Sequence, residues 1–195
     1  MFTIKASKQL IDHCNQQLDD CSFGIRIDKF KNGSRENQFV GIVSESIVRK
    51  GFGLPWVTCE ENFIKDYDIL WNGIKIDVKT VGRNSYPTKS FVNNLMLDQI
   101  EYDCEYYIFC SYHKANNEAT ICGFIDKDTL KKVATLLPAG TTRTRFDGTQ
   151  FQLKYDNYEI ENHKLTNAFS FQKLKLLLEF DYEMKKGNHY GCPFY

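Results

Sequence analysis

The sequence has no long hydrophobic run and no excess charge of either sign. None of its apolar stretches approaches the roughly 20 residues of a membrane span. Its N-terminus lacks the continuous apolar segment of a signal peptide, so we expect a cytoplasmic protein with no membrane partner. Lysine plus arginine and aspartate plus glutamate number 25 each, so any surface that binds nucleic acid must be local.

The sequence also lacks the cysteine and histidine spacing of a zinc site. Its seven cysteines are an odd number and include no Cys-x-x-Cys pair, and its four histidines are scattered. We interpret the cysteines as small buried hydrophobic residues in a reducing compartment. With 42% hydrophobic and 26% charged side chains, residues 1–195 are predicted to form one globular domain.

Hydrophobic periodicity and turn residues predict a succession of helices and strands. One helix is expected within residues 4–21, capped by Ser7, and a second opens at Ser34 and runs to about residue 50. Further helices are expected at 95–102, 127–137 and 165–180, and strands at 24–27, 56–59, 106–112, 119–125 and 151–155.

The most informative segment, residues 67–80, is predicted to be a β-hairpin. Asn72-Gly73 lies between two β-prone runs and indicates a type I′ turn, because both of its residues need positive φ. This turn places Asp68 opposite Asp77, and side chains alternate between the two faces of each strand. The first face is apolar and consists of Ile69, Trp71, Ile74, Ile76 and Val78.

The second face of the hairpin carries the charged residues. It consists of Asp68, Leu70, Lys75, Asp77 and Lys79. Opposed side chains lie within about 5.5 Å at Cβ, where like charges destabilise a pair. A hard divalent cation would offset this repulsion, because Mg²⁺ takes carboxylate oxygens as ligands. A solvated face whose acids point apart is the alternative that the residues alone leave open.

Asp68 and Asp77-x-Lys79 across a hairpin resemble the catalytic signature of the PD-(D/E)xK nuclease superfamily. This superfamily includes restriction endonucleases, Holliday-junction resolvases and recombination exonucleases. The resemblance covers about residues 34–112, and Tyr67 stands where the signature has proline. It implies a restriction-endonuclease-like α/β core, a mixed central β-sheet flanked by helices, which the C-terminal strands and helices complete or decorate.

The resemblance also implies the roles of the site residues. Asp68 and Asp77 would ligate one or two Mg²⁺ ions, for which Mn²⁺ could substitute. Lys79 would orient the attacking water or stabilise the transition state. Glu45, on the helix before the hairpin, and the backbone carbonyl of Val78 would complete the set of metal ligands.

Glu45 needs further comment, and two other residues are considered beside this set. By position alone Glu45, on the flank of an apolar stripe, is as compatible with exposure as with partial burial. Asp66 shares the face of Asp68 but would pair beyond the lysine, so Asp68 is preferred. Gln99 stands where some members of the superfamily place a supporting glutamine.

Two polar segments are candidates for contact with DNA. One follows the site strand at residues 81–89, and the other spans residues 141–145. Their cations are Arg83, Lys89, Arg143 and Arg145. Arginine, lysine and hydroxyl side chains bind phosphate oxygens and base edges, although ordinary exposed loops have the same composition.

The predicted function is Mg²⁺-dependent hydrolysis of phosphodiester bonds in double-stranded or branched DNA. DNA is favoured because most of the superfamily acts on it. A site- or structure-specific endonuclease, such as a restriction enzyme, is favoured over a recombination or repair exonuclease, because 195 residues leave no room for a motor domain. Two alternatives remain, a DNA-binding protein that keeps the fold without cleavage and a structural protein with solvated acids. The sequence leaves a homodimer open.

Overall fold

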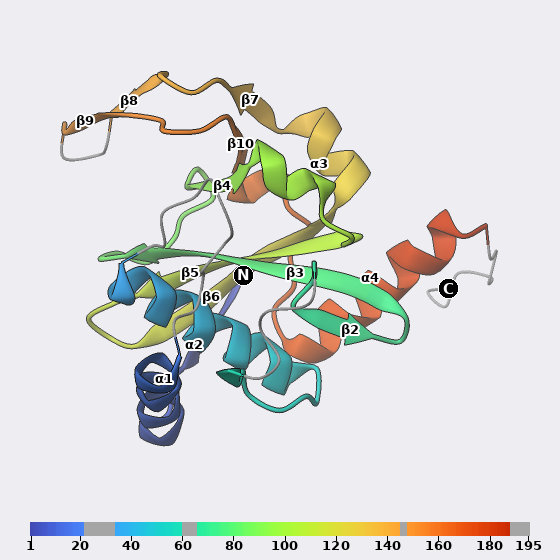
Figure 1. Ribbon diagram of the computed structural model, residues 1–195. Helices are drawn as coiled ribbons and strands as arrows, with labels where there is room; N and C mark the ends of the chain where they lie inside the picture. Colours follow the sequence, from blue (N-terminus) through green and yellow to red (C-terminus); the bar gives the residue numbers. More distant parts are fainter. Residues whose placement is uncertain (22–33, 60–65, 145–147, 188–195) are drawn as a thin grey trace.

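A mixed five-stranded β-sheet forms the centre of the fold (Figure 1). The computed structural model describes residues 1–21, 34–59, 66–144 and 148–187. The strands are β1 (Phe2–Lys5), β2 (Ile69–Trp71), β3 (Ile74–Arg83), β5 (Tyr106–His113) and β6 (Glu118–Asp126). Their order is β1-β6-β5-β3-β2, in which β3 and β5 are parallel and the other neighbours are antiparallel.

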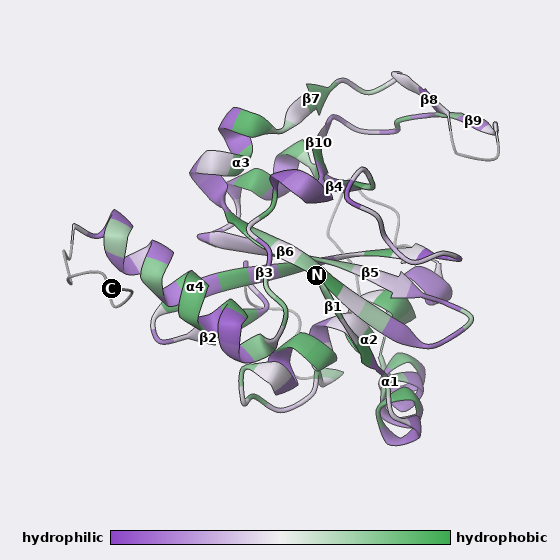
Figure 2. Ribbon diagram, turned by 180° about the vertical axis from the view of Figure 1, so that it is seen from behind, coloured by the Kyte–Doolittle hydropathy of each residue, from purple (hydrophilic) through white to green (hydrophobic). Residues whose placement is uncertain are grey.

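Three helices cover one face of this sheet. They are α1 (Lys8–Asp20), α2 (Arg35–Gly51) and α4 (Phe171–Lys185). In Figure 2, α1 and α4 alternate between hydrophobic and hydrophilic residues, as expected of helices with one buried side. Among the described residues, no helix has the length and apolar character needed to cross a membrane.

A smaller layer covers the opposite face. It contains β4 (Val92–Met96), a 3₁₀ helix (Leu97–Glu101), α3 (Lys127–Val133), β7 (Thr135–Leu137), β10 (Asn157–Glu161) and a second 3₁₀ helix (Asn162–Lys164). β4, β10 and β7 form a three-stranded sheet, while β8 (Thr142–Thr144) and β9 (Gln150–Gln152) pair only with each other. The fold is therefore mixed α/β, and because both faces of the central sheet are covered, β5 is buried along nearly its whole length.

Local sequence signals at the helix starts are confirmed. The Ser7 hydroxyl accepts a hydrogen bond from the Leu10 N–H at 3.1 Å, and the Ser34 hydroxyl accepts one from the Asn37 N–H at 3.3 Å. Each bond satisfies an N–H group that has no partner within the first turn of a helix. The predicted strands at 106–112 and 119–125 are also present, as β5 and β6.

Predictions for the second layer are wrong in several places. The predicted helix at 95–102 is the end of β4 followed by the first 3₁₀ helix. The predicted helix at 127–137 ends at Val133, and β7 follows it. Both β4 and β7 pair with β10, so tertiary pairing overrides the local helical pattern.

Other boundaries also differ. Helix α4 begins at Phe171 instead of residue 165, after a Ser170 cap, and the strand predicted at 151–155 is β9. Residues 56–59 form no strand, and β1 was not predicted. The strand predicted at 24–27 lies outside the described residues.

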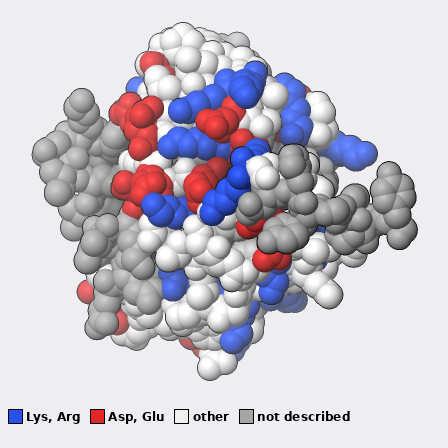
Figure 3. Space-filling view, turned by 90° about the vertical axis from the view of Figure 1, so that its right-hand side faces the viewer, with Lys and Arg blue, Asp and Glu red and all other residues white. Residues whose placement is uncertain are grey.

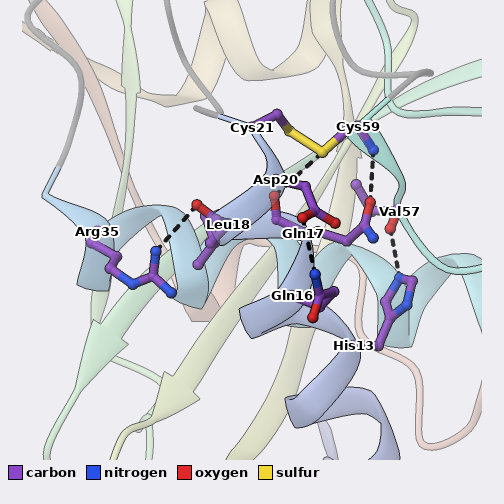
Figure 4. Close-up of a disulfide and its surroundings, with 9 residues drawn as sticks. All are labelled: His13, Gln16, Gln17, Leu18, Asp20, Cys21, Arg35, Val57 and Cys59. Carbon is purple, nitrogen blue, oxygen red and sulfur yellow. Dashed lines mark hydrogen bonds between the residues drawn. A yellow bond between two sulfur atoms is a disulfide. The ribbon is translucent and has the colours of Figure 1, made fainter.

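The prediction that the cysteines are buried thiols is confirmed for four of them and wrong for two. Buried free thiols are found at Cys14, Cys104, Cys110 and Cys122, whereas Cys192 lies outside the described residues. Cys21 and Cys59 form a disulfide, with their Cα atoms 6.0 Å apart (Figure 4). The disulfide joins the end of α1 to the segment before the hairpin, and the Cys59 N–H also donates to Gln17 Oε1 at 2.9 Å.

Removing this disulfide should lower the stability of the fold. The bond closes a segment of 38 residues, and a crosslink of that span restricts the unfolded chain enough to contribute about 2–4 kcal/mol. We expect Cys21→Ser/Cys59→Ser to lower the free energy of unfolding in urea by this amount. A reductant should lower the stability of the wild type and leave that of the double variant unchanged. Equal stability of oxidised and reduced wild type would contradict the prediction.

Candidate functional site

The hairpin turn has the geometry that its sequence predicts. Asn72 and Gly73 have φ values of 49° and 80°, the left-handed values of a type I′ turn. The register follows, with Ile69 opposite Ile76. The predicted apolar face lies in the main core, where Ile69, Ile74 and Ile76 are buried and Trp71 and Val78 pack against them. The charged face therefore points to the layer formed by β4 and the first 3₁₀ helix.

Asp68 is held at the start of the hairpin by backbone hydrogen bonds. The β2–β3 ladder begins at Ile69, and the Asp68 N–H donates to the Ile76 carbonyl at 3.0 Å. Its carboxylate Oδ2 accepts a hydrogen bond from the Val78 N–H at 2.7 Å. The Asp68 carboxylate therefore contacts the backbone of β3 directly, at the residue that follows Asp77.

Asp77 and Lys79 form a buried ion pair on β3. Lys79 Nζ lies 2.6 Å from Asp77 Oδ2, and the two side chains are only 16% and 5% exposed. Residues two apart on a strand share a face, so this pairing follows directly from the Asp-x-Lys spacing. A charge pair with so little exposure is costly to form, and it is more typical of a functional site than of a stabilising surface contact.

The pKa of Asp68 is raised well above its usual value. The main cause is burial of its carboxyl group, although the residue as a whole keeps some exposure. The negative charges of Glu45 and Asp77 raise the pKa further, as does a hydrogen bond between the Asp68 and Asp77 carboxyl groups, and Lys79 partly opposes them. Three acids therefore act on one another here, and a single lysine does not fully compensate them.

Glu45 is buried on α2 and is tied to the hairpin through Arg49. Both residues are 8% exposed, and Arg49 Nη1 lies 3.7 Å from Glu45 Oε1. Arg49 also donates from Nε to the Pro55 carbonyl at 2.9 Å and from Nη1 to the Asp68 carbonyl at 3.4 Å. Arg49 thus connects helix α2, the segment that follows α2, and the backbone of Asp68. Sequence reasoning missed Arg49, for which the only signal is its position four residues after Glu45.

Replacing Arg49 with alanine should destabilise the protein strongly. The substitution removes the hydrogen bonds to two carbonyl groups and leaves Glu45 without this buried cation, a change that typically costs about 3–5 kcal/mol. Urea unfolding would measure the loss. Arg35→Ala is the matched control, because Arg35 pairs with Asp19 where both side chains are more than half exposed, and its loss should cost less than about 1 kcal/mol. Equal losses in both variants would contradict this role for Arg49.

The donor set at the hairpin suits a hard cation. Asp77 Oδ2 is fully buried, and among the described residues it has no hydrogen-bond partner beyond its ion pair with Lys79. Asp68 adds a second carboxylate. Carboxylate oxygens, with water completing the shell, are the ligands that Mg²⁺ prefers. Within the described ranges, no group of three or more His, Cys, Asp or Glu side chains is already arranged around a common metal position. Asp68 and Asp77 are the two candidate ligands that the hairpin itself supplies, and Glu45 acts on Asp68 as a neighbouring negative charge.

Two of the predicted DNA-contacting cations have partners within the protein. Arg83, at the end of β3, points inward: its Nη2 donates to the Val92 carbonyl at 2.6 Å, its guanidinium lies 4.8 Å from the Phe91 ring centre, and burial lowers its pKa. Arg143 pairs with Glu159, and Lys89 is exposed. Arg145 lies outside the described residues.

Gln99 lies in the first 3₁₀ helix and is 7% exposed. Its backbone carbonyl accepts a hydrogen bond from the Tyr107 hydroxyl at 3.3 Å, which fixes this helix against β5. Tyr107 is the strand neighbour of Asp77. Gln99 therefore lies next to the strand neighbour of Asp77.

The surface around the hairpin turn and α4 is not a uniform basic field. In the space-filling view of Figure 3, basic and acidic side chains are interspersed over this face. On the hairpin and on α4, Lys75 pairs with Asp103 and Lys185 with Asp126. A nucleic acid that reaches the hairpin would therefore need additional contacts elsewhere on the protein.

Comparison with known proteins assigns neither a family nor a function to the chain. The chain matches no protein-family model, no curated protein and no solved structure. The functional argument therefore depends on the geometry of the hairpin and on its Asp68, Asp77 and Lys79 side chains, and on the chemistry that two close carboxylates and an ammonium group can perform.

Proposed function

We propose that this protein is a Mg²⁺-dependent DNA endonuclease of the PD-(D/E)xK type. The observation that carries the proposal is the arrangement on one hairpin: Asp68 is bonded to the Val78 N–H at 2.7 Å, and Asp77 is 2.6 Å from Lys79. Two nearby acids followed by a lysine on the same strand face are the chemical groups of that signature.

The arrangement of elements supports the same proposal. Helix α2 precedes the β2–β3 hairpin and contributes Glu45, and β3 continues through a crossover to its parallel neighbour β5. This is consistent with a restriction-endonuclease-like core in which the crossover is built from β4 and a 3₁₀ helix. The additional strands from β7 to β10 then decorate that core.

The roles of the residues follow from their chemistry. Bound Mg²⁺, or Mn²⁺ in its place, would supply a Lewis acid that lowers the pKa of a water molecule and offsets charge at the phosphodiester. Asp68 and Asp77 would hold the ion, and Glu45 would keep the adjacent potential negative. Lys79 orients the attacking water or stabilises the additional negative charge of the transition state. The Val78 carbonyl, next to Asp77 in sequence, would be a backbone ligand, as the resemblance to the superfamily implies. The proposal places the protein in the cytoplasm, with its DNA substrate.

Incubation of the purified protein with plasmid DNA tests the proposal. Supercoiled, linear and branched DNA would each be mixed with Mg²⁺, Mn²⁺ or a chelator and analysed on gels. Conversion of supercoiled DNA to nicked or linear forms with metal alone supports an endonuclease, whereas shortening of linear DNA only would indicate an exonuclease. Binding without any product in either metal would contradict catalysis and favour a DNA-binding protein with a nuclease-like fold.

A further inference from the structure

Lys79 lies against a carboxylate oxygen that a bound cation would use. Its Nζ is 2.6 Å from Asp77 Oδ2, and that oxygen is fully buried. Within the described part of the chain, the lysine is the partner that this oxygen has. Mg²⁺ takes a carboxylate oxygen at about 2.0–2.1 Å. The ammonium group therefore covers an atom that the metal would need to approach.

The same ammonium group also acts on Asp68. Burial and the negative charges of Glu45 and Asp77 raise the pKa of Asp68, and the positive charge of Lys79 lowers it. Lys79 is thus close enough to both carboxylates to supply part of the positive charge that a divalent cation would bring. In the metal-free protein, the lysine serves as the counterion of the two acids.

The two partners of the ion pair differ in their freedom to move. Asp77 lies within the ladder between β3 and β5, opposite Tyr107, and its side chain is only 5% exposed. The side chain of Lys79 is 16% exposed, and a lysine ammonium group is carried on a long, flexible stem. The sheet therefore fixes the acid, whereas the ammonium group can turn away from it.

We propose that Lys79 closes the metal site of the free protein and leaves Asp77 when a divalent cation binds. The inference rests on the proposed function, because it concerns the ion that the nuclease site would hold. Without metal, the ammonium group is paired with the Asp77 carboxylate. With metal, the positive charge of the ion repels the ammonium group, which becomes available to the attacking water or to the phosphate. Lys79 is therefore an autoinhibitory contact in one state and a functional group in the other.

This exchange should weaken the binding of the metal. Only molecules in which Lys79 has left Asp77 can bind the cation, so the apparent affinity is the intrinsic affinity multiplied by the fraction of such molecules. Separating a buried ion pair leaves an uncompensated charge, which keeps this fraction small. A neutral side chain at position 79 should therefore tighten metal binding while it removes a group that cleavage needs. Affinity and activity change in opposite directions.

Binding of Mn²⁺ to the wild type and to three variants tests the inference. Lys79→Met removes the ammonium group, and Lys79→Arg keeps a cation beside Asp77. Lys75→Met is the matched control, because Lys75 lies on the same face of the hairpin and pairs with Asp103, whose side chain is 68% exposed. Each full-length protein would be titrated with Mn²⁺ in the absence of DNA. Electron paramagnetic resonance of free Mn²⁺ would give the affinity.

Lys79→Met should bind Mn²⁺ at least about tenfold more tightly than the wild type. Lys75→Met should change the affinity by less than about twofold, because its ion pair is exposed. Lys79→Arg should bind no more tightly than the wild type, since a guanidinium group can also pair with Asp77. Unchanged or weaker binding in Lys79→Met would overturn the inference. An equal gain in Lys75→Met and Lys79→Met would show a general effect of charge and would also overturn it.

Chemical labelling of the wild type gives a second test that does not depend on the folding of a variant. An N-hydroxysuccinimide ester of acetic acid reacts with amines, and mass spectrometry would give the rate at each lysine. An ammonium group held by a buried carboxylate should react slowly. Saturating Mn²⁺ should raise the rate several-fold at Lys79 and leave the rate at Lys75 unchanged. Equal rates at Lys79 with and without bound Mn²⁺ would mean that the lysine stays on Asp77.

The outcomes separate the lysine exchange from the nuclease. A wild type that binds Mn²⁺ and cuts DNA, with no gain of affinity in Lys79→Met and no change in labelling, overturns the exchange alone. Tighter Mn²⁺ binding in Lys79→Met, beside a wild type that binds Mn²⁺ and cuts no DNA, supports the exchange and overturns the nuclease. Absence of Mn²⁺ binding in the wild type and in Lys79→Met overturns both.

Discussion

Asp77→Asn should reduce metal-dependent DNA cleavage by at least about 1,000-fold, equivalent to about 4 kcal/mol of transition-state stabilisation. Asparagine has the same shape as aspartate but removes a formal charge from a side chain that is 5% exposed. The loss would weaken cation binding and leave the transition state with less charge compensation. Initial rates on plasmid DNA, measured with saturating Mg²⁺ and with Mn²⁺, check the prediction.

Lys79→Met tests the other half of the ion pair. Methionine keeps much of the apolar stem and removes the ammonium group, so we expect about a 100-fold or larger loss of rate. Removing one partner of a buried ion pair also destabilises a fold. The double variant Asp77→Asn/Lys79→Met removes both charges, and its circular dichroism and thermal midpoint therefore show whether lost activity reflects lost chemistry or lost folding.

Asp66→Asn is the matched control for both substitutions. Asp66 is exposed, lies close to the site in sequence and shares the chemistry of its acids. Its variant should cleave DNA at the wild-type rate. If Asp77→Asn and Asp66→Asn retained equal activity, the hairpin would not be the catalytic site, whatever the protein does with DNA.

The hairpin could be predicted because its determinants are local. Asn72 and Gly73 set the turn, the turn sets the register, and the register places Asp77 and Lys79 on one face. Each step depends on residues less than ten positions apart. Helix starts at Ser7 and Ser34 were predictable for the same reason, since a cap acts within one turn.

Features that depend on distant contacts could not be read in the same way. The partners of Arg143 and of Cys21 lie 16 and 38 residues away, and nothing in their local sequence identifies them. Arg83 resembled a phosphate-binding residue in a polar segment, but β3 continues to this position and Phe91 and Val92 enclose its side chain. Its charge therefore serves the fold.

Asp68→Asn should have opposite effects on activity and on stability. Cleavage should fall at least about 1,000-fold, because one of the two carboxylates is lost. The metal-free protein should become more stable at pH 8. The Asp68 pKa is raised by burial and by the charges of Glu45 and Asp77, so its ionised form is disfavoured in the folded state. An amide oxygen can still accept the hydrogen bond from the Val78 N–H.

The pH dependence follows from the direction of this shift. Below about pH 4, Asp68 is protonated in the folded and in the unfolded chain. As pH rises, the unfolded chain loses this proton first, while the folded protein keeps it until its raised pKa is reached. Unfolding therefore releases a proton across this interval, and the contribution of Asp68 to stability falls by about 1.4 kcal/mol for each pH unit. Above the raised pKa the deficit is constant.

A bound divalent cation should reverse this deficit, because it favours the ionised carboxylate. We expect Mg²⁺ or Mn²⁺ to raise the thermal midpoint of the wild type more at pH 8 than at pH 5, and to have little effect on Asp68→Asn. Asp66→Asn should respond to the metal as the wild type does. Differential scanning fluorimetry over this pH range, with and without metal, gives the comparison. Equal metal responses at both pH values in the wild type and in Asp68→Asn would mean that the cation does not bind at this carboxylate.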